Sequence, residues 1–504
     1  MKKSKNNLIN ILVLLFLTIF PLIFDNYYFN ITVTKYKVFA ILACGIFFAG
    51  LYYSLCANIE KNNRLKLNSV SCYLKQLTIT DLFFLLFLSA AGLSCLMSEW
   101  RLPAFSGACG KYIGFIFMLL TGGLYYGITR HMTLNRSIRY SFPVILILVS
   151  LMAVIQFCGY DIFGFYAHMA PGTSQMYIAT FGHIDVFSAF LCVYLPVCLY
   201  LFCHTPGRES CVYGISCFMG FAGIFSSNSD SCYIGLLLSM AVLLILSVSH
   251  TDILKKYGIL LFLFSLCAIL WNLLHMIFMS SMRDSSSITS AFTSPESILL
   301  FALSGSILLF ISLLSGKKKK NPPNWISYLL IAFFAAALIL LISLFLYFSF
   351  IDTDSDIGIL ENYLRFNEHW GSDRGYVWKW LFQFFCFSPL FTRLFGAGPD
   401  TTALILYKYF KTEMVDELGV FYASAHNEYL NYLVTIGLVG TILYIGILVL
   451  SVIKCFHRRF ENAFYGAVGL AIISYSAMAA VNISQPITMP FIYLLIAFAN
   501  TKGN

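Results

Sequence analysis

The chain has 504 residues, of which 59% are hydrophobic and only 11% are charged. Soluble domains average about 25% charged residues, so this composition excludes a string of soluble domains and indicates a polytopic membrane protein. The net charge of +9 would suggest nucleic acid binding in a soluble protein, but here it fits Lys and Arg in cytoplasmic loops, and we expect no nucleic acid partner.

Fourteen apolar runs have about the length that a transmembrane helix needs, which is about 20 residues. We therefore expect an all-α fold with about 14 spans, and 12 at the least. The first run imitates a secretory signal, but no small-residue cleavage site follows, so it is interpreted as a retained span. The expected spans lie near residues 8–24, 37–56, 80–97, 111–129, 141–160, 184–204, 211–226, 231–250, 257–279, 296–316, 326–350, 431–453, 463–481 and 488–501.

The distribution of basic residues predicts the orientation. With the N-terminus in the cytoplasm, 21 of the 32 Lys and Arg residues fall in cytoplasmic segments, as the positive-inside rule requires. The KKKK run at 317–320 would then act as a topology anchor. Both termini are expected on the cytoplasmic side.

Three short outer segments carry candidate substrate-binding residues. Arg101 and Lys111 flank LPAFSGACG between the third and fourth spans. TFGHIDVF places His183 and Asp185 at the mouth of the sixth span, and SSNSDSCYIG places Asp230 in the turn before the eighth. Each of these residues has an ordinary alternative role, because Asn, Asp and Ser favour caps and turns.

Residues 351–430 interrupt the succession of spans and separate an N-terminal membrane part (1–350) from a C-terminal one (431–504). This outer loop holds 11 of the 23 acidic residues. Long loops are usually functional or disordered, and the many aromatic residues argue against disorder. We expect an amphipathic helix over 376–387 and a Gly-rich turn followed by a short helix within 394–410.

Arg374 lies in GSDRGYVWKW, between two glycines and ahead of the aromatic helix. A guanidinium group binds phosphate bidentately and keeps its charge, so Arg374 is a candidate anion binder. The alternative is an arginine that only anchors the loop at the membrane interface.

His426 lies in AHNEYLNYLVTIGL, where the twelfth span begins. Ser424 is expected to cap this helix, which would place His426 and Asn427 in its first turn. The positive end of the helix dipole would keep the imidazole neutral and able to accept a proton, and would attract phosphate. His426 is therefore a candidate base and Asn427 a candidate substrate-binding residue. The alternative is that His426 and Asn427 merely cap the helix.

The sequence contains no motif for a metal, nucleotide or dinucleotide site. It contains no H-E-x-x-H, no P-loop and no dinucleotide fingerprint, so we expect neither a metal nor another cofactor. The apolar spans are almost free of charge, whereas ion and proton pathways usually leave charged residues within spans. A transporter is therefore disfavoured.

Over most of its length the chain resembles the O-antigen ligase and polymerase family. The resemblance rests on the long outer loop before the third-last span, Arg374 in DRGYVW, the Gly396-x-Gly398 turn, and His426-Asn427 ahead of a Gly-rich span. Upstream, FSGACGKYIGF, TFGHIDVFSAF and NSDS follow the family's order of outer motifs. His183 and Asp185 stand where asparagines are more usual. The span count exceeds the family's common twelve or so, so residues 257–350 would include extra helices peripheral to the site.

The resemblance implies a GT-C-like glycosyltransferase in the cytoplasmic membrane of a bacterium. Such enzymes take a glycan from undecaprenyl diphosphate at the outer face, without a metal or a nucleotide sugar. Arg374 would hold the diphosphate, Lys111 would be a second phosphate contact, and His426 would accept the acceptor hydroxyl's proton or position it. The anomeric centre would be inverted. The partners would be the lipid-linked donor, a glycan or lipid-glycan acceptor, and the bilayer.

Three functional readings stay open. A polymerase and a ligase share the same donor chemistry, so the sequence does not separate them. A lipid-linked oligosaccharide flippase or exporter should show an internal repeat and a polar cavity within the spans, and neither is visible in the sequence. A scaffold of a glycan-assembly complex would leave Arg374 and His426 dispensable.

Overall fold

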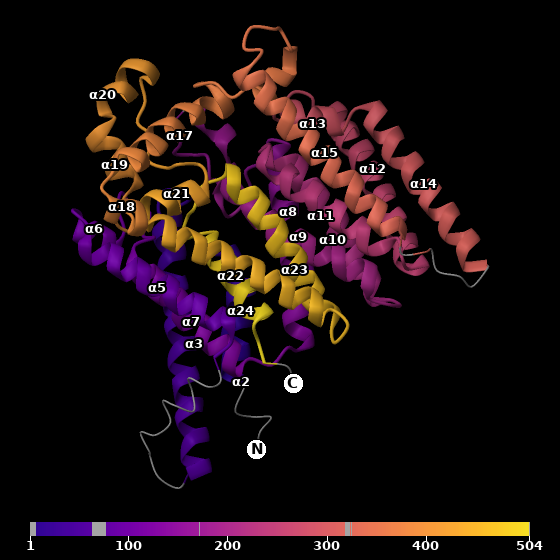
Figure 1. The fold of residues 1–504 in the computed structure, drawn as a ribbon. Coiled ribbons are helices and arrows are strands. Elements are labelled where there is room, and N and C mark those ends of the chain that lie inside the picture. The colour runs from indigo at the N-terminus through magenta and orange to yellow at the C-terminus, as the bar shows by residue number, and fades with distance from the viewer. Residues whose placement is uncertain (1–6, 63–76, 171, 318–322, 324, 503–504) are drawn as a thin grey trace.

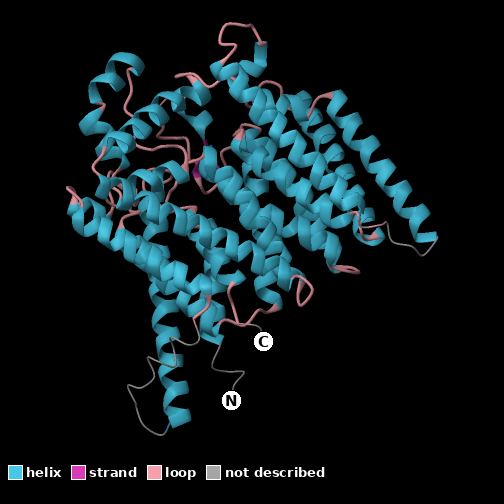
Figure 2. Ribbon diagram, viewed as in Figure 1, coloured by secondary structure: helices cyan, strands magenta, loops and turns pink. Residues whose placement is uncertain are grey.

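The computed structural model describes residues 7–62, 77–170, 172–317, 323 and 325–502. Within them the fold is all-α apart from a small antiparallel hairpin of β1 (Tyr177–Ile178) and β2 (Gly182–His183) (Figure 2). Ten of the described helices are long and apolar enough to cross a membrane, and further apolar helices are shorter, so the expected polytopic class is confirmed. Some basic residues used to predict the orientation lie outside the described residues, namely Lys2, Lys3, Lys5, Arg64, Lys66, Lys75 and Lys318 to Lys320.

Each of the first eleven expected spans coincides with one helix to within one or two turns. These helices are α2 (Asn7–Leu22), α3 (Ile31–Asn62), α5 (Ile79–Met97), α7 (Phe115–His131), α8 (Arg136–Phe157), α9 (Ile184–His204), α10 (Glu209–Ser227), α11 (Ser231–Ser247), α12 (Thr251–Ile277), α14 (Pro295–Lys317) and α15 (Trp325–Phe350). Shorter elements between them are α6 (Arg101–Ser106), η1 (Thr173–Met176) and α13 (Ser287–Phe292).

Helix α9 forms the centre of the bundle. Its sequence is apolar on all sides, as is typical of a fully enclosed helix, and every residue from Asp185 to Cys203 is buried. Helices α8, α10, α11 and α23 (Ala463–Met478) pack around it. By contrast, α15 has no buried residue, and α14 lies at the edge of the molecule (Figure 1). The first residues of α9, which include Asp185, and His183 before them are therefore surrounded by the helices that pack around α9.

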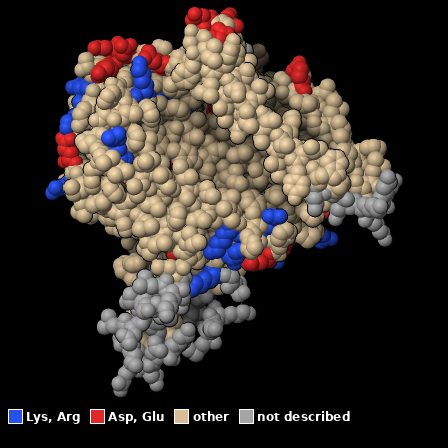
Figure 3. Space-filling view, viewed as in Figure 1, with Lys and Arg blue, Asp and Glu red and all other residues tan. Residues whose placement is uncertain are grey.

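The charges are arranged in a manner typical of a membrane protein. On the face shown in Figure 3, charged side chains gather at two ends and leave an uncharged band between them. The first and last helices share one of these ends. Asn10 Nδ2 donates to the Thr133 carbonyl (3.0 Å), and the Lys502 N–H donates to the Thr129 carbonyl (3.3 Å). The start of α2 and the residues after α24 (Met489–Ala499) therefore both adjoin the end of α7.

Residues 351–430 fold into a lobe with its own hydrophobic core, as the aromatic content predicts. Its elements are η2 (Gly358–Leu360), α16 (Glu361–Leu364), α17 (Trp370–Phe387), α18 (Leu390–Phe395), α19 (Thr402–Tyr409), α20 (Lys411–Glu413) and a π-helical turn, Met414–Leu418. Nine buried lobe residues make the core together with Val434 of the following helix: Tyr376, Val377, Trp380, Leu381, Ile405, Leu406, Phe410, Met414 and Ala425. The expected amphipathic helix and the Gly-rich turn before a short helix are both present.

The expected continuous helix over 431–453 is wrong. The chain forms α21 (Glu428–Thr435), breaks at Gly437 with φ +72°, and continues as α22 (Gly437–Arg458). After α22 come α23, η4 (Ala479–Val481) and α24. The lobe completes the broken end of α21, because the N–H groups of Ala397 and Gly398 donate to the carbonyls of Val434 (3.0 Å) and Thr435 (2.9 Å). The Gly-x-Gly turn thus supplies bonds that a continuous helix would make internally.

We expect Gly437→Ala to destabilise the protein strongly. A β-carbon at this position would lie 2.3 Å from the Leu394 carbonyl oxygen, so the lobe and α22 would have to separate, at a cost of more than about 3 kcal/mol in the free energy of unfolding. Gly419→Ala is the matched control, because Gly419 also has positive φ (64°) but nothing lies within 4 Å of its would-be β-carbon. Gly419→Ala should cost only about 1–2 kcal/mol in the free energy of unfolding, the strain of a β-carbon in the left-handed region. Denaturant unfolding of both purified variants tests this, and equal losses would contradict it.

Candidate active site

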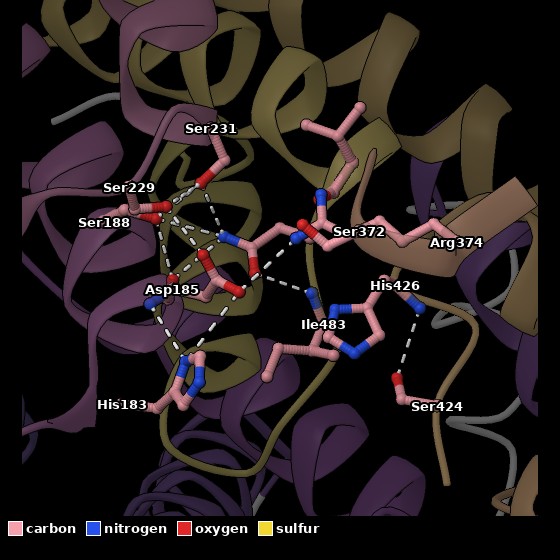
Figure 4. Close-up of polar contacts among 12 residues, drawn as sticks. His183, Asp185, Ser188, Ser229, Ser231, Ser372, Arg374, Ser424, His426 and Ile483 are labelled. Atoms are coloured by element: carbon pink, nitrogen blue, oxygen red, sulfur yellow. Dashed lines mark hydrogen bonds and ion pairs between the residues drawn. The ribbon is translucent and has the colours of Figure 1, made fainter. Parts of the chain in front are cut away.

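Five segments far apart in sequence meet where the lobe joins the bundle. They are the start of α9 (183–188), the turn before α11 (229–231), two lobe segments (371–374 and 424–428) and the connection between α23 and α24 (481–484). Figure 4 shows their polar side chains pointing toward one another. The structure therefore brings Arg374 and His426 together with His183 and Asp185.

An unusual backbone conformation aims Arg374 into this site. Gly371, Ser372 and Asp373 all have positive φ (62°, 58° and 64°), which Ser and Asp adopt rarely and which marks functional strain when the surroundings hold it. The guanidinium Nη1 donates to the Val481 carbonyl (2.9 Å), and Nη2 lies 3.6 Å from Asp185 Oδ2. The side chain is only 22% exposed, so the charge of Arg374 is partly desolvated.

Asp185 supplies the counter-charge. Ser229 Oγ donates to Asp185 Oδ1 (2.6 Å), while Oδ2 faces both Arg374 and His183. His183 is the N-cap of α9, and its Nδ1 accepts from the Asp185 N–H (3.2 Å). Burial lowers the pKa of His183, which favours the neutral imidazole that this capping bond requires. His183 therefore acts as a cap as well as lying in the site.

His426 faces the same cluster from the lobe. Its φ is +48°, and its N–H donates to Ser424 Oγ (3.3 Å). The ring nitrogen Nδ1 is buried and has no hydrogen-bond partner within the described residues, which is rare enough to require a reason. Burial, and then the positive charge of Arg374, lower the pKa of His426 to about 4. The imidazole is therefore neutral at pH 7.

The expected capping pattern at this helix is wrong in register. Ser424 does not cap the helix; Asn427 does, by accepting from the Leu430 N–H (3.0 Å). His426 thus precedes the helix instead of lying in its first turn, and only Asn427 is used as a cap. The next residue, Glu428, is buried, and its carboxylate accepts hydrogen bonds from Tyr444 and Tyr475 (3.0 Å for Tyr475). It fastens α21 to α22 and α23.

The structure also brings Lys111 to this region. Its amine donates to the Ala423 carbonyl, three residues before His426, and burial lowers its pKa. The loop that carries Lys111 is held by Asp400, whose Oδ2 accepts from the N–H groups of Ala108 (2.8 Å) and Ile113 (3.3 Å). Burial raises the pKa of Asp400 to about 6. The loop after α6 is therefore held near the site by its contacts with two lobe residues, Asp400 and Ala423.

Two other candidates lie at the margin. Asp230 immediately precedes α11 and its Oδ2 accepts from the Tyr363 hydroxyl (3.4 Å); burial raises the pKa of its carboxyl. Arg101 is exposed on α6 and forms no ion pair within the described residues, so the structure does not bring it into the cluster.

Several residues of the site are not identified by sequence reasoning. The Val481 carbonyl and Asn482 belong to the connection VNISQP. Its polar and proline residues between two apolar spans indicate a loop, but they do not indicate a site. Ser188 and Ser231 hydrogen-bond to each other beside Asp185 (2.8 Å). Hydroxyl and amide groups of this kind are common in turns, so their type alone does not mark them.

The site therefore combines a neutral imidazole with an unused nitrogen, a guanidinium group and an ionisable carboxylate. An arginine in this setting can bind a phosphate or stabilise a leaving anion, and a neutral imidazole can accept a proton. No group of three or more His, Cys, Asp or Glu side chains in the described part of the chain is arranged to hold a metal ion.

Residues 285–445 match the model of a protein family described as O-antigen ligase. The matched region contains Arg374, Asp400 and His426, whereas Lys111, Asp185 and Asn482 lie outside it. Among curated proteins the comparison found no match.

Proposed function

We propose that this chain is a transferase of the O-antigen ligase type, because residues 285–445 match the model of that family, and that it transfers a glycan from undecaprenyl diphosphate to an acceptor at the outer face of a bacterial cytoplasmic membrane. The observation that carries the proposal is the convergence of Arg374 and His426 in one buried site at the end of a membrane bundle. The lobe end would face outward, and both termini would lie in the cytoplasm.

In the proposed reaction, the acceptor hydroxyl oxygen attacks the anomeric carbon of the donor sugar, and the bond from that carbon to the diphosphate oxygen breaks. The diphosphate leaves with the electron pair. Arg374 would stabilise its charge, with Lys111 as a second contact. His426 would take the hydroxyl proton. Attack opposite the leaving group inverts the anomeric centre.

Asp185 has a defined part in this scheme. In the structure it lies 3.6 Å from Arg374 Nη2, which keeps the guanidinium in place while no diphosphate is bound. A diphosphate would compete with the carboxylate for the same donors. Asp185 would thus hold Arg374 near the position that the substrate needs.

The experiment that tests the function is a glycan analysis of bacteria that lack this protein, complemented with the wild type. Glycans on undecaprenyl diphosphate and glycans on the surface would be sized separately. Single repeat units stalled on the lipid at the outer face would indicate a polymerase, and full-length chains stalled there would indicate a ligase. Units trapped on the inner face would instead indicate an exporter, and unchanged glycans would refute the proposal.

A further inference from the structure

The side chain of Asn482 joins two elements that hold Arg374. It is 1% exposed, and its Nδ2 donates to the backbone carbonyl of Asp185 (2.9 Å). Its Oδ1 accepts from the Ile483 N–H (2.7 Å). One carboxamide therefore ties the connection between α23 and α24 to the first turn of α9.

The same amide nitrogen organises the surrounding hydroxyls. It lies 3.1 Å from Ser188 Oγ and 3.2 Å from Ser231 Oγ. Ser231 in turn is 2.9 Å from Ser229, whose hydroxyl donates to the Asp185 carboxylate (2.6 Å). All of these groups are buried, so each depends on its protein partners for hydrogen bonds. The orientation of the Asp185 carboxylate follows from this network.

The two partners of Arg374 lie on the two elements that Asn482 ties together. The Val481 carbonyl, which accepts from Nη1, belongs to the residue before Asn482. The Asp185 carboxylate, which faces Nη2, belongs to the residue whose carbonyl Asn482 binds. Separating these elements would take the two partners of the guanidinium apart.

We propose that Asn482 is a positioning residue of the donor site: its hydrogen bond to the Asp185 carbonyl fixes the spacing between the Val481 carbonyl and the Asp185 carboxylate, and thereby the place of the Arg374 guanidinium that binds the diphosphate. This inference rests on the proposed function. Burying an amide is costly unless its hydrogen bonds are made, and here they are made to residues that set the position of Arg374.

The test measures binding of undecaprenyl diphosphate to the purified full-length protein in nanodiscs. We expect Arg374→Ala to weaken binding by about a hundredfold and Asn482→Ala by about tenfold. Because Asn482 acts through Arg374, adding Asn482→Ala to Arg374→Ala should change the affinity by less than about twofold. A residue that only stabilises the fold would weaken binding by the same factor in both backgrounds.

Asn500→Ala is the matched control. Asn500 is also buried (5% exposed), and its Nδ2 donates to Ser451 Oγ (3.0 Å) and to the Ile496 carbonyl (2.9 Å) at the other end of α24. It should bind undecaprenyl diphosphate like the wild type. If Asn482→Ala does not fold, Asn482→Ser retains a donor and should give an intermediate loss that again disappears without Arg374.

The outcomes separate the two proposals. Wild-type affinity in Asn482→Ala or Asn482→Ser, or equal losses with and without Arg374, would overturn the role of Asn482 and leave the proposed function intact. No binding by the wild type, or equal binding by the wild type and Arg374→Ala, would overturn the donor assignment and the role of Asn482 with it.

Discussion

Arg374→Ala is expected to abolish glycan transfer, with at least about a hundredfold loss of kcat/KM, while the protein still inserts in the membrane. The guanidinium is the charged group positioned between Asp185 and the Val481 carbonyl, and removing one preorganised donor from a developing anion costs about 10²- to 10³-fold. Arg374→Lys should retain a small residual rate, because an ammonium keeps the charge but loses the bidentate geometry. The measurement is transfer from a lipid-linked donor by purified variants.

Arg393→Ala is the control for Arg374→Ala. Arg393 is an exposed arginine on α18 of the same lobe, and its loss should leave transfer unchanged. If Arg374→Ala retained full activity, or if both variants were equally impaired, Arg374 would be an interfacial anchor instead of a diphosphate ligand.

His426→Ala is also expected to abolish transfer, and the wild type should show a characteristic pH profile. The pKa of His426 is lowered to about 4, so the neutral, proton-accepting form is present above pH 4 and is lost only below it. We expect kcat/KM to change by less than about twofold between pH 5.5 and 7.5. An ordinary histidine, with a pKa of about 6.5, would lose about tenfold by pH 5.5.

The charged groups that face His426 support this profile. Arg374, Lys111 and His183 lower its pKa, while Asp185 opposes them. Asp185→Asn should therefore move the acid limb of the profile to still lower pH. His168→Ala, which removes an exposed histidine from another loop, should leave the rate unchanged. An acid limb near pH 6.5, or full activity of His426→Ala, would contradict the assignment.

The sequence predicts the class of fold well because the apolar runs are long and their lengths follow from the thickness of a bilayer. It places the boundaries less well where polar groups are satisfied by tertiary contacts. Lys35 is an example: its charge suggests a loop, yet it lies in α3, fully buried, and its amine donates to the carbonyls of Phe20 (2.8 Å) and Pro21 (2.9 Å) at the end of α2. No local pattern predicts such a distant partner.

Only some residues of the candidate site could be proposed from the sequence. Arg374 and His426 stand out because a charged or titratable residue is conspicuous in so apolar a chain. Asn482 does not stand out, because an asparagine between two helices is ordinary. Its importance depends on contacts with residues almost three hundred positions earlier. The break at Gly437 was likewise hidden, since the carbonyls it frees are bonded by the distant Gly396–Gly398 turn.

The three consecutive side chains of His426, Asn427 and Glu428 each have a different structural role. The first faces the site, the second closes the start of α21, and the third is clamped by two tyrosines. Because the tasks are ordered along the backbone, inserting or deleting one residue here would displace all three at once. We expect a one-residue insertion or deletion here to be far less tolerated than an insertion at an exposed turn such as Gly419. Natural insertions and deletions should therefore be absent from residues 426–428.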